Sequence, residues 1–179
     1  MSGSAWRESG RAGPEEPART AGAGEPAIRE PRDAMVREIN DHLAAESAQN
    51  LGALLAGMTE DCYNLVPCDP SPLYRGPGAV AKRYRMLWTA LPDLQVRLRR
   101  IVAIEGEMAV TEHTLSGTHS GPLFGVAATA RPVQVETVVI WEFAGNRIRG
   151  EIVYFDLATM LRQVGVLALP DAGSAPLVR

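Results

Sequence analysis

The stretch VQVETVVIWEFAGNRIRGEIVYF at residues 133–155 decides the fold. Apolar and polar residues alternate on both sides of Ala144-Gly145-Asn146, a pattern typical of two antiparallel strands joined by a tight turn. Counting outward from a pivot near Asn146 gives the residues that lie opposite one another on a single face of the sheet. The expected cross-strand pairs are Val139 with Val153, Trp141 with Glu151, and Thr137 with Phe155.

The segments around this hairpin extend the prediction to a whole domain. Residues 94–104 and 108–119 read as an earlier pair of strands, and 62–66 as a short strand followed by a Pro- and Gly-rich loop at 67–78. Apolar residues recur at helical spacing after a cap at Asp33, in a short segment at 51–58, and after Pro77. A final helix after Asp156 ends at Gly165. Helices, an antiparallel meander and a closing helix indicate an α+β fold.

Composition places this domain between two tails. The 179 residues are 46% hydrophobic and 22% charged, which suits one globular domain. Residues 1–32 are rich in Gly, Ala, Pro, Glu and Arg and read as a disordered tail, and residues 169–179 as a flexible one. The domain is therefore expected at 33–168.

Charge and hydropathy narrow the functional classes. A net charge of -3 without a clustered basic face argues against nucleic-acid binding. No apolar run reaches the length of a membrane span, and the N-terminus lacks the apolar core of a secretory signal. A cytoplasmic protein with free thiols at Cys62 and Cys68 is expected. Phosphate-binding loops, GxSxG elbows and His–carboxylate clusters with metal-ligand spacing are not evident, which argues against nucleotide-dependent chemistry, hydrolysis by a covalent nucleophile and a metal site.

Five motifs resemble the SnoaL-like polyketide cyclase and ester cyclase family of the nuclear transport factor 2-like superfamily. They are ALPDL at 90–94, GTHSGPLFGV at 117–126, ARPV at 130–133, NRIRGEIVYFD at 146–156 and LRQVG at 161–165. The resemblance covers residues 33–166. It implies a cone in which a curved sheet wraps on helices around an apolar pocket, a homodimer, and ring closure by intramolecular aldol condensation without metal or organic cofactor.

The resemblance also implies an acidic residue in the last long strand, assisted by a histidine on the neighbouring strand. Alignment places these two at Val153 and Val139, and neither valine can transfer a proton. The remaining acidic candidate is Glu151, beside Trp141. A carboxylate set against an aromatic ring in an apolar pocket has its pKa raised by desolvation. The alternative is a rim carboxylate paired with Arg149 or Arg147.

Other polar residues have two interpretations each. His119 could contact a ligand oxygen at the pocket mouth as an assisting donor, or hold the GPLFG loop through backbone hydrogen bonds. Asp156 could act in the site or simply cap the last helix. His113, expected opposite Arg99, and His42 read as packed residues of the sheet and first helix. Glu112 and Glu136 are expected on a solvated face.

Large apolar side chains complete the expected pocket, and they suggest a planar polycyclic or terpenoid-like ligand. The expected substrate-binding residues are Tyr63, Trp88, Phe124, Trp141, Phe155, Val139 and Val153. Two functions stay open. The first is a cyclase or isomerase-type enzyme that uses Glu151, with His119 assisting, on a hydrophobic polyketide-like substrate. The second is a small-molecule-binding or accessory protein of the same fold without catalysis, which the valines at 139 and 153 favour.

Overall fold

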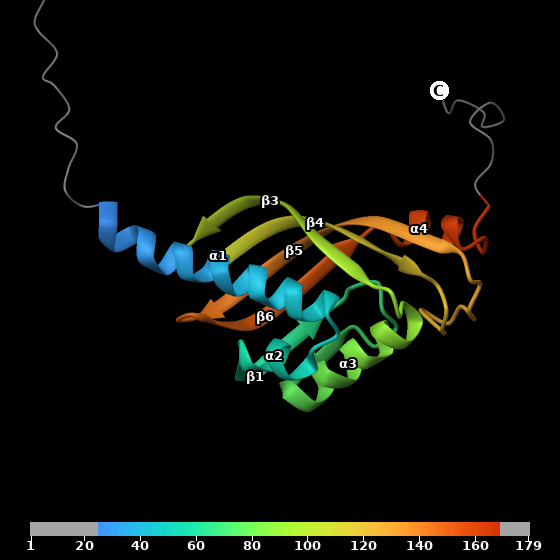
Figure 1. Ribbon diagram of the computed structural model, residues 1–179, viewed down its shortest axis with the longest axis horizontal. Helices are drawn as coiled ribbons and strands as arrows, with labels where there is room; N and C mark the ends of the chain where they lie inside the picture. Colours follow the sequence, from blue (N-terminus) through green and yellow to red (C-terminus); the bar gives the residue numbers. More distant parts are fainter. Residues whose placement is uncertain (1–24, 169–179) are drawn as a thin grey trace, which may run out of the picture.

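The computed structural model describes residues 25–168, with side chains from residue 31 onward. Helices come first, strands dominate the second half, and a short helix closes the domain (Figure 1). The elements are α1 Glu25–Ser47, α2 Leu51–Ala56, β1 Met58–Leu65, β2 Leu73–Arg75, α3 Gly76–Ala90, β3 Gln95–Glu105, β4 Met108–Thr118, β5 Pro132–Ala144, β6 Arg147–Phe155 and α4 Leu157–Gln163.

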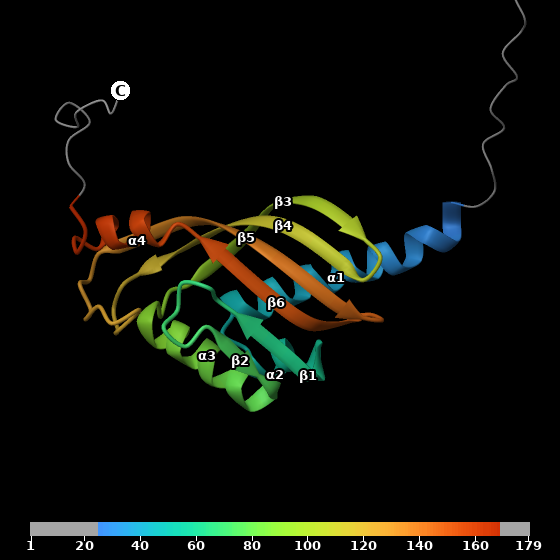
Figure 2. The ribbon, with the colours of Figure 1, turned by 180° about the vertical axis from the view of Figure 1, so that it is seen from behind.

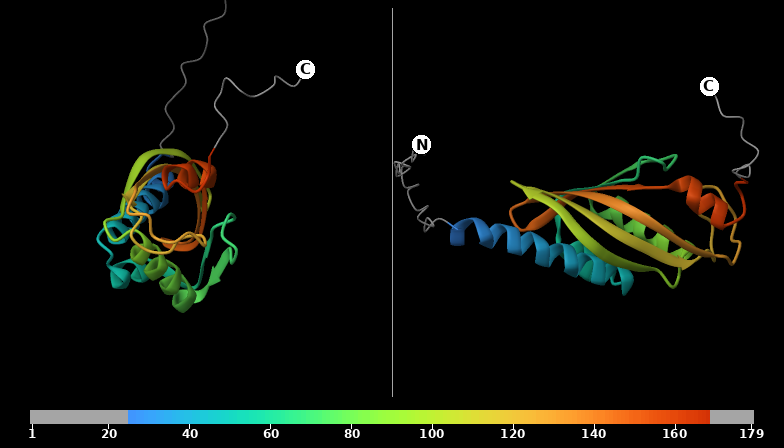
Figure 3. Two further views of the ribbon diagram at one scale, coloured as in Figure 1. Left: turned by 90° about the vertical axis from the view of Figure 1, so that its right-hand side faces the viewer. Right: turned by 90° about the horizontal axis from the view of Figure 1, so that it is seen from above.

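The six strands form one curved sheet in the order β2-β1-β6-β5-β4-β3. Strand β1 runs parallel to β6, and the other neighbours are antiparallel. Seen from the end in Figure 3, the sheet curls around α1, and α3 lies across its open side. Figure 2 shows the long strands β3 to β6 from behind, crossing the molecule beside one another. The α+β cone predicted from the sequence is confirmed.

The hairpin of β5 and β6 has the predicted register. Val139 pairs with Val153, Trp141 with Glu151, and Thr137 with Phe155. Buried residues alternate with more exposed ones along β5, which places the odd-numbered side chains on the concave face. The register matters because a shift by one residue would turn Glu151 to the outside.

Several local predictions were wrong. Helix α1 begins at Glu25 rather than after Asp33, with Pro31 inside it, so residues 25–32 are helical and not part of a tail. The expected loop at 67–78 contains β2, because residues 73–75 find hydrogen-bonding partners on β1. His113 pairs with Leu98 rather than Arg99, since a bulge interrupts the register of β3 and β4. Residues 1–24 and 169–179, the rest of the expected tails, lie outside the described residues.

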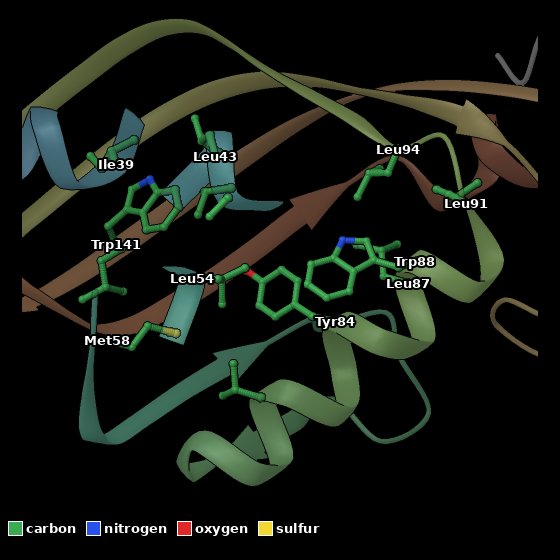
Figure 4. Close-up of a cluster of buried hydrophobic side chains, with 14 of the residues drawn as sticks. Ile39, Leu43, Leu54, Met58, Tyr84, Leu87, Trp88, Leu91, Leu94 and Trp141 are labelled. Atoms are coloured by element: carbon green, nitrogen blue, oxygen red, sulfur yellow. The ribbon is translucent and has the colours of Figure 1, made fainter. Parts of the chain in front are cut away.

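The hydrophobic core fills the space between the concave face of the sheet and the helices (Figure 4). Ile39 and Leu43 of α1 pack near Trp141 of β5, and Tyr84 and Trp88 extend from α3 toward the same interior. Trp141, the largest of the fully buried side chains, donates a hydrogen bond from Nε1 to the Thr111 hydroxyl at 2.7 Å. No helix within residues 25–168 combines the length and apolarity needed to cross a membrane.

Gly121 fixes the loop between β4 and β5 against the end of α3. A Cβ atom at this position would lie 2.4 Å from the Thr89 carbonyl oxygen, which belongs to the backbone and has little freedom to move. We therefore expect Gly121→Ala to destabilise the protein by about 1–3 kcal/mol, which lowers Tm by roughly 2–12 °C. Thermal unfolding followed by circular dichroism measures the change. Gly78→Ala is the matched control, because a Cβ there meets nothing within 4 Å. Equal Tm values for the Gly121 variant and wild type would contradict the close approach.

Candidate active site

A mostly apolar cavity lies inside the cone and encloses about 630 Å³ of space, including its opening. Side chains from α1, α3, α4 and five of the six strands reach it. The lining residues are Glu46, Asn64, Arg83, Tyr84, Leu87, Leu91, Val96, His113, Leu115, Leu123, Phe124, Val135, Thr137, Val139, Glu151, Val153, Phe155 and Met160.

Glu151 is the central polar group of this cavity and is only 4% exposed. Its Oε2 atom accepts hydrogen bonds from the Tyr84 hydroxyl at 2.6 Å and from the Asn64 amide at 2.7 Å. The alternative of a rim carboxylate is wrong, because Arg149 pairs with Glu142 and Arg147 donates to the backbone carbonyl of Met58. The structure therefore places Glu151 in the pocket, as the sequence predicted.

His42 and Tyr84 form a chain of hydrogen bonds that ends at Glu151. The His42 Nε2 atom lies 2.8 Å from the Tyr84 oxygen. Because the Tyr84 hydroxyl uses its proton on Glu151, Nε2 must be the donor to Tyr84. Burial lowers the pKa of His42 and, with the nearby Glu151 charge, raises the pKa of Tyr84 well above 10. His42 is therefore a neutral donor that orients Tyr84.

Glu46 adds a second carboxyl group to the site. It follows His42 by one helical turn on α1 and is buried. Burial, assisted by the negative charge of Glu151, raises the pKa of Glu46 to about 8, while Arg83 acts in the opposite direction. Glu46 is therefore mainly protonated at neutral pH. A protonated carboxyl group and a buried carboxylate in one cavity are the two halves of an acid/base pair.

Three polar atoms of the lining have no hydrogen-bond partner in the described part of the chain: Nε2 of His113, Oδ1 of Asn64 and Nε of Arg83. His113 is neutral, since burial lowers its pKa to about 4. Unpaired buried polar atoms are costly unless a ligand or water satisfies them. They thus give the apolar cavity a few points at which a ligand oxygen or hydroxyl could be recognised.

His42, Glu46 and Glu151 also satisfy a distance requirement for a shared cation, since their ligand atoms lie within 4.8 Å of one another. The cluster is not evident from the sequence, because Glu151 lies on β6, far along the chain from His42 and Glu46 on α1. However, Nε2 of His42 already forms a hydrogen bond with Tyr84, and Glu46 holds a proton at neutral pH. A cation would have to replace that proton and break the hydrogen bond, so the donor set fits hydrogen bonding better than metal binding.

The predicted pocket residues divide into two groups. Phe124, Phe155, Val139 and Val153 line the cavity together with Glu151. Tyr63, Trp88 and Trp141 do not.

The three excluded aromatics have other packing roles. Tyr63 packs against Gly150 under the Arg75 guanidinium, because strand alternation on β1 turns Asn64 inward instead. The Trp88 indole donates to the Glu46 carbonyl at 3.1 Å. The indole of Trp141 lies against the His42 ring, with centroids 5.3 Å apart.

His119 and Asp156 lie outside the cavity lining. The buried His119 ring meets the Thr129 hydroxyl at 3.0 Å, and its backbone bonds to Thr129, Ala130 and Arg131. These contacts match the loop-holding interpretation rather than an assisting donor. Asp156 caps α4 by accepting from the Thr159 amide at 3.0 Å. Glu112 and Glu136 pair with Arg100 and Arg99 on the outer face.

Several polar residues of the candidate site were not singled out as site residues from the sequence: Glu46, Tyr84, Arg83, Asn64 and His113, which line the cavity, and His42, which contacts Tyr84. The sequence did contain a signal for two of these residues, His42 and Glu46. His42 and Glu46 are four residues apart in a helix, on the face that carries Ile39 and Leu43. Polar residues on an otherwise buried helix face indicate a buried polar network.

Solved structures with the same fold are numerous. One of them is a candidate SnoaL-like polyketide cyclase from Jannaschia sp. CCS1, with 18% identity over 76% of this chain and 94% of that chain and a TM-score of 0.68. TsrD from Streptomyces laurentii is 24% identical over 76% of this chain and 98% of that chain, with a TM-score of 0.67. A Catenulispora acidiphila protein with a ketosteroid isomerase-like fold is 16% identical over 73% and 93%, with a TM-score of 0.63. No curated protein matches the sequence.

The fold is the one found in ketosteroid isomerase-like and nuclear transport factor 2-like proteins. The family model for the SnoaL-like polyketide cyclases matches residues 34–164. The chain therefore belongs to the SnoaL-like polyketide cyclase family.

The raised pKa of Glu46 predicts a pH-dependent stability. In the unfolded chain the pKa of Glu46 is near its ordinary value of 4.5, and burial raises this pKa to about 8 in the folded chain. The folded state therefore binds the extra proton between these values, and stability falls as pH rises through that window. We expect Glu46→Gln to match wild type near pH 5 and to exceed its Tm by several degrees at pH 8.5. Thermal unfolding at pH 5, 7 and 8.5 measures the difference. A difference that stays constant with pH would contradict it, and the exposed Glu105→Gln is the control.

Proposed function

We propose that this protein is a cofactor-independent cyclase or isomerase-type enzyme that acts on a hydrophobic, polyketide-like substrate, with Glu151 as the general base. One observation carries the proposal. A carboxylate lies buried in an apolar cavity, held by Tyr84 and Asn64, and a second carboxyl group that keeps its proton at neutral pH lines the same cavity.

The chemistry follows from this division of roles. Glu151 removes a proton from a carbon between two carbonyl groups, which leaves an enolate. The enolate carbon attacks a further carbonyl group elsewhere in the same molecule, so a carbon–carbon bond forms and an alkoxide results. Glu46 gives its proton to the alkoxide, and the proton held by Glu151 returns to Glu46, directly or through solvent. The atoms balance without a co-reactant, and each proton transfer is of the general acid/base kind.

Tyr84 and His42 support this reaction by fixing Glu151. The hydrogen bond from Tyr84 holds Oε2 in place, and His42 holds Tyr84. Fixed hydrogen bonds of this kind reduce the reorganisation that a reaction needs. The assisting donor that was assigned to His119 from the sequence is better supplied by Glu46, which lines the cavity while His119 does not.

The second candidate function is small-molecule binding without catalysis. It is favoured by Val139 and Val153, which occupy the positions where the family resemblance implies a histidine and an aspartate. Both valines line the cavity, so apolar side chains stand where the resemblance implies the histidine–aspartate pair. For either function we also propose that the protein is a cytoplasmic homodimer.

A turnover assay tests the enzyme proposal. We expect Glu151→Gln to lower the rate on a ring-open aromatic polyketide β-keto ester by about 10²–10⁴-fold, the contribution typical of general acid/base catalysis. Tyr84→Phe is expected to lower it by a smaller factor, on the order of 10-fold, because Glu151 loses one of its two hydrogen bonds.

The matched control is Glu142→Gln, which changes a carboxylate of the neighbouring strand that pairs with Arg149 outside the cavity. Circular dichroism confirms that each variant is folded. Equal rates for wild type and Glu151→Gln would remove Glu151 from the mechanism. Binding of the ester by wild type without any turnover would favour the binding protein.

A further inference from the structure

Arg83 is a buried cation that the proposed reaction does not use. It lies on α3, its side chain lines the cavity, and the residue is only 8% exposed. Its Nε atom has no hydrogen-bond partner, and none of the ion pairs formed among residues 31–168 involves it. A guanidinium keeps its charge throughout the physiological pH range. Burying such a charge without a partner is costly.

The nearby acidic groups do not neutralise this charge by contact. Glu46 and Glu151 face Arg83 from the inner cavity, and Asp69 faces it from the outside. None of the three has an oxygen within 4.0 Å of the guanidinium nitrogens. Glu151 is engaged by Tyr84 and Asn64. Asp69 already accepts from the Tyr74 hydroxyl at 3.1 Å and the Ser71 amide at 2.9 Å.

The position of Arg83 between two hollows makes it accessible to a ligand. A second, outer hollow is lined by Arg83 together with Asp69, Pro70 and Met86. Arg83, Leu123 and Phe124 belong to the lining of both hollows. The guanidinium therefore stands at the boundary between the outer hollow and the apolar interior, where a ligand in the cavity could place a charged end.

We propose that Arg83 binds a carboxylate of the ligand, whose apolar ring body occupies the inner cavity. The planar guanidinium can give two parallel N–H···O bonds to the two oxygens of a carboxylate, which matches it in shape and charge. The inference rests on the proposed function in taking the cavity as the ligand site, and it deepens that function. It adds to the substrate class a free carboxylate on the aromatic polyketide-like molecule.

A matched pair of probes tests the proposal in the full-length protein. 2-Naphthoate and methyl 2-naphthoate share one ring system and differ in charge, and isothermal titration calorimetry measures their Kd values. Wild type is expected to bind naphthoate about 10-fold more tightly than the ester, the effect typical of a charged hydrogen bond. Arg83→Gln is expected to weaken naphthoate binding by about 10-fold or more and to leave ester binding within about 2-fold. Arg85→Gln, an exposed arginine of the same helix, is expected to change neither.

Thermal unfolding separates ligand binding from a structural role. Without ligand, Arg83→Gln is expected to have a Tm equal to or above that of wild type, because an unpaired buried charge is removed. Naphthoate is expected to raise the Tm of wild type and not that of the variant. A large loss of Tm in the ligand-free variant would show that Arg83 is structural and would overturn the proposal.

The other results are also decisive. Equal naphthoate affinity in wild type and Arg83→Gln, or no naphthoate binding by wild type, overturns the carboxylate site. Ester binding without any preference for naphthoate removes the carboxylate site but keeps the cavity as a ligand site. Failure of the proposed function has a different signature, in which Glu151→Gln keeps full turnover while naphthoate binding still depends on Arg83.

Discussion

The hydrogen bonds that hold the buried Glu151 carboxylate are the constraint on which the interior depends. Its partners come from separate parts of the chain, with Asn64 on β1, Tyr84 on α3 and, through Tyr84, His42 on α1. A buried carboxylate without such partners would carry a large desolvation cost. Strand β6, which carries Glu151, must therefore pack against β1, α3 and α1 in one arrangement. The parallel pairing of β1 with β6 meets that need, because it sets Asn64 directly beside Glu151.

The electrostatics of the cavity follow from burial acting on several groups at once. Desolvation keeps both His42 and His113 neutral, and together with the charge of Glu151 it keeps a proton on Glu46 at neutral pH. Arg83 is the exception, because a guanidinium cannot give up its proton under these conditions. The cavity thus contains an acid, a base and a fixed cation within mostly apolar walls. The proposed function uses these groups to move a proton on an apolar substrate and to position a negative group of that substrate.

Much of the fold could be predicted from local patterns. Alternation along residues 133–155 gave the correct register, since side chains of a strand with one buried face must alternate with a period of two. That register also placed Glu151, Val139 and Val153 on the inner face. The predictions failed where non-local pairing decided the outcome. Strand β2 forms inside a Pro-rich loop only because β1 offers it hydrogen bonds, and the bulge in β3 moved His113 away from Arg99.

The sequence by itself determined the strand periodicity, the α+β class, the family resemblance and one acidic candidate, because each of these rests on residues that are close together along the chain. The tertiary structure alone decided which distant groups surround that candidate. It turned Asn64 inward and Tyr63 outward, joined His42 and Glu46 of α1 to Glu151 of β6, and left Arg83 without a partner. These facts depend on how helices pack across the sheet. Packing sets burial, and burial sets both the protonation state and the hydrogen-bonding needs of each group.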